Sequence, residues 1–172
     1  MRKIFFLVFI LILGQGVKIK AQESRVNYHD PQTWILGYFD SDRFLAEPHE
    51  VWYNKGFDDY NLDNEAFIEL SELDLKDIGV LIVLATWCPD SRREVPRFMK
   101  ITQLVGLTEE KIKLLGTDSN KVAPIDGYDE FNIERVPTFI FYRNKKEIGR
   151  IIEYPKASLE RDMVNILGAE NK

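Results

Sequence analysis

The chain has 172 residues, of which 45% are hydrophobic and 30% charged, and its formal net charge is −5. This is the size of one globular domain with a substantial core, and the acidic balance argues against binding to nucleic acid or to anionic membrane surfaces. A single cysteine, Cys88, excludes a disulfide within the chain, a cysteine-based zinc site and a dithiol redox pair. The two histidines, His29 and His49, leave little room for a histidine-rich metal centre, so we expect neither a metal nor a cofactor.

Residues 1–21 have the pattern of a secretory signal peptide. Arg2 and Lys3 precede an apolar run from Ile4 to Leu13, and a small residue stands at the predicted cut. A retained membrane anchor is the alternative, but the apolar run is about half of the roughly 20 residues that a spanning helix needs. We therefore predict an exported protein, periplasmic or secreted, without stable membrane association after cleavage. Cleavage removes four basic residues and no acidic one, which takes the net charge from −5 to −9.

Residues 22–78 are predicted to be an N-terminal extension that packs on the main domain. After an irregular polar start, residues 32–45 carry apolar side chains in the spacing of an amphipathic helix. Residues 50–53 are predicted to form a short strand, and Asp63 is a good N-cap for a following helix.

Residues 79–172 are predicted to be the main domain, because their pattern is sharper. The expected elements are a buried strand over 79–85, a helix over 91–105, a strand over 111–116, a short helix over 125–131, strands over 137–142 and 147–153 joined by a polar turn, and a last helix capped by Ser158. This order predicts an α/β fold.

The segment TWCPDS, at the junction of the predicted buried strand and the next helix, places Cys88 at a helix N-terminus. Unpaired N–H groups and the helix dipole favour an anion there, and the thiolate is the nucleophilic form of cysteine. Arg92 and Arg93 add positive charge nearby, whereas Asp90 and Glu94 oppose it. The sequence therefore predicts a reactive thiol at Cys88.

The motif WCPDS around Cys88 resembles the WCxxC active-site motif of the thioredoxin superfamily, with Ser91 in place of the second cysteine. Its Pro-Asp interior is similar to the WCPDC of small thioredoxin-related proteins. Pro96 lies eight residues after Cys88, where thioredoxins have a proline that kinks the active-site helix, and residues 136–138 (VPT) resemble their cis-proline loop. The likeness covers about residues 79–168.

This resemblance implies a thioredoxin-like mixed β-sheet flanked by helices, with an N-terminal helical extension. It implies that Cys88 is the nucleophile, with Ser91 beside it as a hydroxyl that could hydrogen-bond the thiolate. The implied substrate-binding residues flank the thiol or belong to the cis-proline loop, which in the family lies against the reactive cysteine: Trp87, Pro89, Asp90, Val136, Pro137 and Thr138. The run DSRREVP also resembles exported thioredoxin-like proteins of Gram-negative bacteria.

Two departures from the family pattern limit the predicted chemistry. Ser91 cannot attack a mixed disulfide, which is the task of the second cysteine in the dithiol mechanism. Ile82 occupies the position, six residues before Cys88, where thioredoxins often have a buried acid. Both changes argue against an efficient general disulfide reductase.

The sequence leaves two hypotheses of function. In the first, the protein is a monothiol oxidoreductase or isomerase that exchanges disulfides with protein or small-molecule thiols through Cys88. In the second, it is a non-catalytic thioredoxin-fold module whose Trp87 and Pro137 surface binds an extended peptide. Under either hypothesis we expect a monomer that does not bind nucleic acid.

Overall fold

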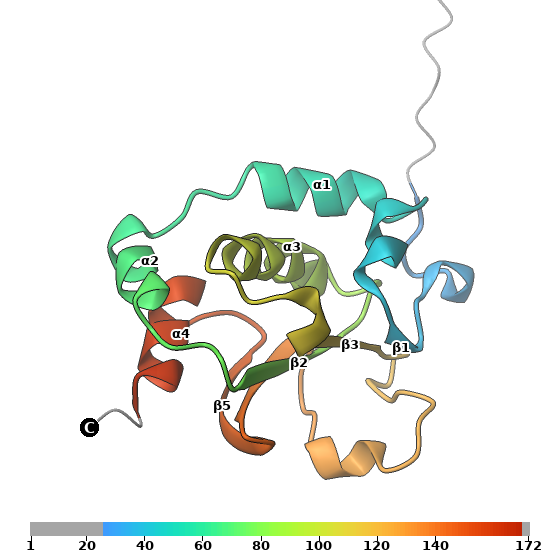
Figure 1. Ribbon diagram of the computed structural model, residues 1–172. Coiled ribbons are helices and arrows are strands. Elements are labelled where there is room, and N and C mark those ends of the chain that lie inside the picture. Colours follow the sequence, from blue (N-terminus) through green and yellow to red (C-terminus); the bar gives the residue numbers. More distant parts are fainter. Residues whose placement is uncertain (1–25, 170–172) are drawn as a thin grey trace, which may run out of the picture.

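A five-stranded mixed sheet organises the fold (Figure 1). The computed structural model describes residues 26–169, so the predicted signal peptide lies outside the described residues. The strand order is β1-β3-β2-β4-β5, in which β2 and β3 are parallel and the other neighbours are antiparallel. The strands are β1 (Gly37–Phe39), β2 (Ile78–Leu84), β3 (Ile112–Gly116), β4 (Thr138–Arg143) and β5 (Lys146–Ile152). The predicted α/β class, with a mixed sheet flanked by helices, is confirmed.

Four α-helices occur in the described residues, and all contribute side chains to the core on one face of the sheet. They are α1 (Glu50–Asp58), α2 (Asn64–Ser71), α3 (Pro89–Leu104) and α4 (Leu159–Leu167). The opposite face is covered by the segment that contains the 3₁₀ turn Tyr128–Phe131, which lies below the sheet in Figure 1. No helix within residues 26–169 is long and apolar enough to cross a membrane.

Strand β2 is apolar throughout because it lies between two cores. Ile82 and Leu84 pack on the helical side with Phe98 of α3, whereas Leu81 and Val83 pack on the opposite side. A central strand that is covered on both faces reads as a continuous apolar run, as the sequence predicted.

Two predicted helix caps are confirmed, and they are bonded to each other. Asp63 Oδ1 accepts a hydrogen bond from Ala66 N–H at 3.2 Å, and Ser158 Oγ accepts one from Arg161 N–H at 3.0 Å. The Ser158 hydroxyl donates to Asp63 Oδ2 at 2.7 Å. These caps fix the start of α2 to the start of α4 and so anchor the N-terminal region on the rest of the domain.

The predicted amphipathic helix over residues 32–45 is wrong. The segment forms two 3₁₀ turns, Pro31–Thr33 and Ser41–Leu45, on either side of the edge strand β1. Ile35, just before β1, and Phe44, in the second 3₁₀ turn, are both buried. Apolar residues in different local structures thus have the spacing of a helix without forming one. The antiparallel pairing of β1 with β3 is a long-range contact that overrides the local pattern.

The predicted strand over residues 50–53 is also wrong, because these residues form the first turn of α1. Tyr53 and Phe57 lie one turn apart with ring centroids 6.2 Å from each other, a helical spacing that a four-residue window is too short to reveal. The predicted short helix over residues 125–131 is reduced to the 3₁₀ turn Tyr128–Phe131.

His49 is buried at the start of α1 between two aromatic side chains. Its ring stacks on that of Tyr28, with 6.3 Å between centroids, and its Nδ1 accepts a hydrogen bond from Trp52 Nε1 at 3.4 Å. Burial lowers the pKa of His49, and the positive charges of Arg43 and Arg92 lower it further. The folded protein therefore disfavours the protonated form of this imidazole.

Gly116, the last residue of β3, lies against the backbone of the N-terminal region. A Cβ atom at this position would lie 1.9 Å from the carbonyl oxygen of Ile35 and 2.7 Å from its carbonyl carbon. Only glycine allows two backbone segments to approach this closely.

Gly116→Ala is expected to lower the free energy of unfolding by about 2–4 kcal/mol, because the backbone at Ile35 must move away. Urea denaturation measures the change. Gly79→Ala is the matched control, since a Cβ there would lie at an ordinary 3.7 Å from Lys111 O. The same loss in both variants would contradict the packing argument.

His49 is expected to make stability depend on pH. An unfolded histidine titrates near about 6.5. As the pH falls below that value, the unfolded chain binds a proton that the folded chain resists, so the free energy of unfolding falls. His49→Gln should lose less stability than the wild type between about pH 7.5 and 5.5 in urea denaturation. His29→Gln, at an exposed position, is the control; equal losses in the wild type and His49→Gln would refute the prediction.

Candidate functional site: the Cys88 thiol at the start of α3

Cys88 lies at the N-cap of α3, directly after the loop that follows β2. Its backbone is extended, with φ −78° and ψ 124°, and its carbonyl accepts the first helical hydrogen bond from Arg92 N–H at 3.1 Å. Pro89 occupies the first helical position, where its missing N–H costs nothing and its fixed φ suits the helix. The local sequence therefore begins the helix at Cys88, so the unpaired backbone N–H groups of the first helical turn lie next to this residue.

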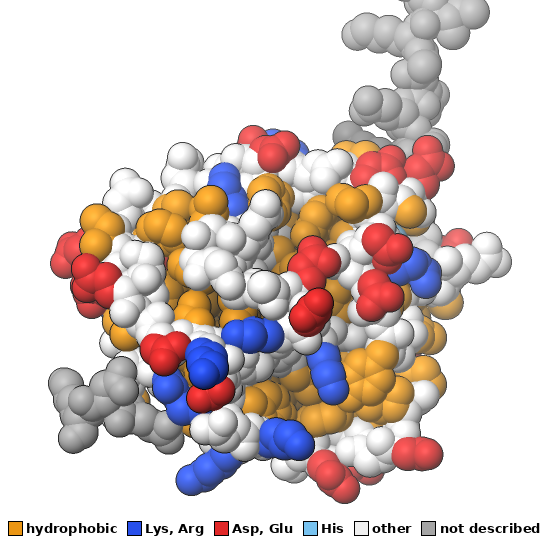
Figure 2. Space-filling model, viewed as in Figure 1, with side chains coloured by type: hydrophobic (Ala, Val, Ile, Leu, Met, Phe, Trp, Pro, Cys, Tyr) orange, Lys and Arg blue, Asp and Glu red, His pale blue; other side chains and the backbone are white. Residues whose placement is uncertain are grey.

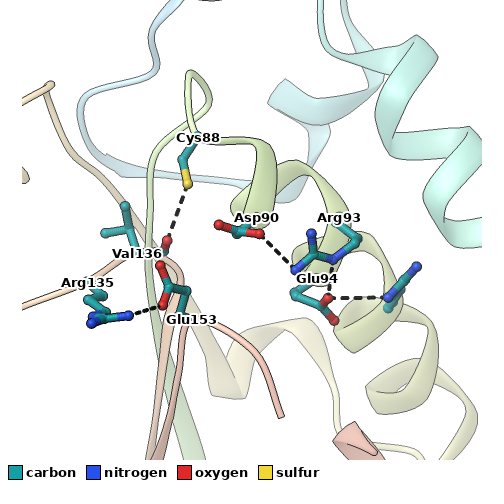
Figure 3. A network of polar contacts seen from close by, with 8 residues as sticks. Cys88, Asp90, Arg93, Glu94, Arg135, Val136 and Glu153 are labelled. Carbon is teal, nitrogen blue, oxygen red and sulfur yellow. Dashed lines mark hydrogen bonds and ion pairs between the residues drawn. The ribbon is translucent and has the colours of Figure 1, made fainter.

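The thiol faces the loop between the 3₁₀ turn Tyr128–Phe131 and β4. Cys88 is 7% exposed, and its Sγ–H donates to the carbonyl oxygen of Val136 at 3.3 Å (Figure 3). The peptide bond between Val136 and Pro137 is cis. The Pro137 carbonyl accepts a hydrogen bond from Glu153 N–H at 2.7 Å, and the Thr138 hydroxyl donates to Arg135 O at 2.7 Å. The structure therefore brings the two predicted parts of the site together.

Ser91 lies at the site but does not contact the thiol through a hydrogen bond. It is fully buried, and its Oγ accepts a hydrogen bond from Ala85 N–H at 3.2 Å. Between residues 26 and 169 there is no hydrogen bond that joins Ser91 to Cys88. The hydroxyl instead closes the loop between the end of β2 and the start of α3.

The other predicted residues around the thiol differ in exposure. Pro89 is exposed, and Asp90 is partly exposed and forms an ion pair with Arg93 at 2.8 Å. Trp87 is partly exposed, but its Nε1 atom is buried and has no hydrogen-bond partner within the described residues. Its ring lies beside that of Trp34, at 6.5 Å between centroids. No sequence pattern connects Trp34 with the site.

Carboxylates on α3 pair with Arg93 and Arg97 of the same helix. Glu94, which is 3% exposed, accepts hydrogen bonds from Arg93 Nε at 2.6 Å and Arg97 Nη1 at 3.2 Å. The hydrogen bond to Glu94 is the main reason that the pKa of Arg93 lies above its usual value. These pairs, drawn in Figure 3, leave little free positive charge on this side of the helix.

A cavity of about 590 Å³ lies at the N-terminal end of β2, away from the thiol. Its lining includes Tyr38 of β1, Gly79, Lys113 and Tyr142. In Figure 2, hydrophobic side chains form a patch close to the place where Figure 1 labels β1. Cys88 does not line this cavity.

Metal-binding side chains do not gather at the site. The described part of the chain contains no group of three or more His, Cys, Asp or Glu residues placed to hold a metal ion.

A mixed sheet whose central strand leads into a helix with a thiol at its N-terminus, opposite a cis-proline loop, defines the class of thioredoxin-like proteins. A family model described as thioredoxin matches residues 51–165, and the chain belongs to this family. The match begins within α1 and includes all of α2, so it starts well before residue 79, where the thioredoxin-like motifs begin.

The chain is similar in sequence to one relative and in fold to two solved structures. The chain is 27% identical over 97 residues to a thioredoxin H-type of Picea mariana, a match that covers 56% of this chain and 73% of the relative. The fold is similar to that of a Pseudomonas aeruginosa protein of unknown function, with a TM-score of 0.52 and 15% identity over 77% of this chain and 89% of the other. It is also similar to an HIV epitope scaffold, with a TM-score of 0.56 and 16% identity over 78% and 94% of the two chains.

Proposed function

We propose that the protein takes part in thiol–disulfide exchange as a single-cysteine member of the thioredoxin family, with Cys88 as the nucleophile. The observation that carries this proposal is the placement of the Cys88 sulfur at the N-terminus of α3, 3.3 Å from the Val136 carbonyl beside cis-Pro137. The helix N-terminus favours the thiolate, which is the reactive form of the side chain.

The exchange begins when the Cys88 thiolate attacks one sulfur of a partner disulfide. A new S–S bond forms between Cys88 and that sulfur, the old S–S bond breaks, and the second partner sulfur leaves as a thiolate. A thiolate of the partner or of a small thiol then attacks the mixed disulfide and displaces Cys88 in its original form. When the attacking thiolate belongs to the partner itself, the result is isomerisation with no net oxidation.

The loop around Pro137 supports binding of an extended partner segment. Among residues 26–169, the Val136 N–H makes no hydrogen bond, and the carbonyl of Val136 is bonded only to the Cys88 thiol, a bond that ionisation of the thiol removes. These two backbone groups of Val136 are the candidates for strand-like pairing with a partner next to the sulfur. Trp87 and the exposed Pro89 border this position.

Ser91 supports a mechanism in which the second thiol comes from another molecule. Its hydroxyl is buried and accepts a hydrogen bond from Ala85 N–H, and a hydroxyl cannot form a disulfide. We therefore propose protein or small-molecule thiols and disulfides as partners. The pattern of residues 1–21 supports export to the periplasm or the exterior, where disulfides persist.

A non-catalytic peptide-binding module is the second candidate function. The low exposure of Cys88, 7%, favours it, because a nucleophile must be reached by its target. In this case the surface around Trp87 and Pro137 would bind an extended segment without covalent chemistry.

Ser91→Cys is expected to raise turnover in an insulin disulfide reduction assay about tenfold or more, because it supplies the missing resolving thiol. The wild type should turn over slowly. Ser71→Cys is the matched control, since it also gives the chain a second thiol, but on the exposed end of α2. High turnover in the wild type, equal to that of Ser91→Cys, would show that the second thiol is not needed.

Cys88→Ser separates the two candidate functions. With a disulfide-bonded peptide, the wild type should gain the mass of one peptide chain by intact mass spectrometry, and Cys88→Ser should not. Binding of the same peptide with its cysteines replaced by serine is measured in parallel by fluorescence anisotropy. A wild type that binds this peptide but never forms the adduct would reject exchange and favour the binding module.

A further inference from the structure

The segment of residues 28–35, which we call the N-terminal clamp, packs against the loop that leads to Cys88. Thr86 Oγ1 accepts a hydrogen bond from Ile35 N–H and donates one to Thr33 O, both at 3.3 Å. The ring of Trp34 lies beside that of Trp87. The clamp precedes the part of the chain that the family model matches, so family membership says nothing about it.

Arg92 connects the clamp to the same loop. Its Nη1 donates to the carbonyl oxygens of Thr86 and Trp87, both at 2.8 Å, and its guanidinium carbon lies 4.3 Å from the centre of the Tyr28 ring. Tyr28 is itself fixed, because its hydroxyl donates to Pro48 O at 2.8 Å. A cation held over an aromatic ring in this way is attracted by the electrons of the ring face.

Arg92 also differs from the other arginines near Cys88 in its charge balance. Arg93, Arg97 and Arg135 each pair with a carboxylate, namely Glu94 or Asp90 on α3, and Glu153 after β5. Arg92 forms no ion pair with any residue between 26 and 169.

Arg92 is also bonded to the residue that carries the thiol, because its N–H donates to the Cys88 carbonyl at 3.1 Å. Burial lowers the pKa of Arg92, while the charges of Tyr28 and Cys88 act in the opposite direction. Tyr128 packs in the same apolar cluster as Cys88, and its hydroxyl donates a hydrogen bond to Lys121 O. Arg92 is therefore the cation without a carboxylate partner that binds the loop just before Cys88, and its charge also acts on His49, whose ring stacks on Tyr28.

We infer that Tyr28 is a positioning residue for the reactive loop. Its ring holds the Arg92 guanidinium against the carbonyls of Thr86 and Trp87, where the positive charge stabilises the Cys88 thiolate. This inference rests on the proposed role of Cys88 as a nucleophile and adds that a residue outside the family match sets its reactivity.

The test is the rate of Cys88 alkylation by iodoacetamide between pH 5 and 9, measured on the full chain at low salt. Cys88 is the one cysteine of the chain, so the reagent reports on it alone. Tyr28→Leu is expected to lower the rate at pH 7 about threefold to tenfold and to move the profile to higher pH, because Arg92 loses its aromatic partner. Tyr28→Phe keeps the ring and should recover most of the rate.

A double-mutant cycle shows whether Tyr28 acts through Arg92. Arg92→Gln should lower the rate by itself, and adding Tyr28→Leu should then change it little. Tyr38→Leu, the same substitution at an exposed tyrosine of β1, should leave the profile unchanged. Urea denaturation checks that each variant is folded, and Tyr28→Met replaces Tyr28→Leu in the cycle should the latter be unfolded.

An equal effect of Tyr28→Leu with and without Arg92 would overturn the inference, as would an unchanged profile in Tyr28→Leu. Mixed-disulfide formation by the wild type is read separately. If the adduct forms and the cycle shows no coupling, the proposed function stands and the inference fails. If the cycle shows coupling and no adduct forms, the inference stands and the proposed function fails.

Discussion

The site depends on one register, that of β2 against β4. Val83 of β2 pairs with Thr138, the first residue of β4, so the chain just before β4 continues alongside the loop that leaves β2. Val136 therefore lies opposite the loop that leads to α3, and its carbonyl accepts a hydrogen bond from the Cys88 thiol. A slip of one residue would turn the side chains of β4 to the other face and separate the two halves of the site.

The sheet is covered unevenly, with a large core on the helical face and a smaller core on the other face. The helices all pack on one face, where Phe98 of α3 stacks on Phe139 of β4 with 4.5 Å between ring centroids. On the other face a single segment covers the sheet, and Cys88 belongs to that smaller core. The larger core lies on the helical face, and the Cys88 thiol lies in the smaller core on the other face.

Local pattern was sufficient for the elements that carry the site. The apolar run of β2 and the caps at Asp63 and Ser158 are properties of adjacent residues, and the sequence predicted them. The motif around Cys88 and the VPT run likewise predicted two segments that the structure brings together. Contacts between distant parts of the chain have no such local signature. The edge strand β1 forms by pairing with β3, and the contact of Tyr28 with Arg92 joins two parts of the chain that no spacing rule connects.

Ser91 also has a structural role in the loop before α3, apart from the absence of a second cysteine. Its buried oxygen accepts the hydrogen bond of Ala85 N–H, a task for which sulfur, a weak acceptor, is poorly suited. The hydroxyl thus ties the end of β2 to the first turn of α3 from within, while Arg92 ties the same loop from the side of the N-terminal clamp. A loop held at both points keeps the Cys88 sulfur in one place next to Val136. Such a fixed sulfur suits the proposed exchange, in which the partner brings the second sulfur and the loop does not have to rearrange to form an internal disulfide.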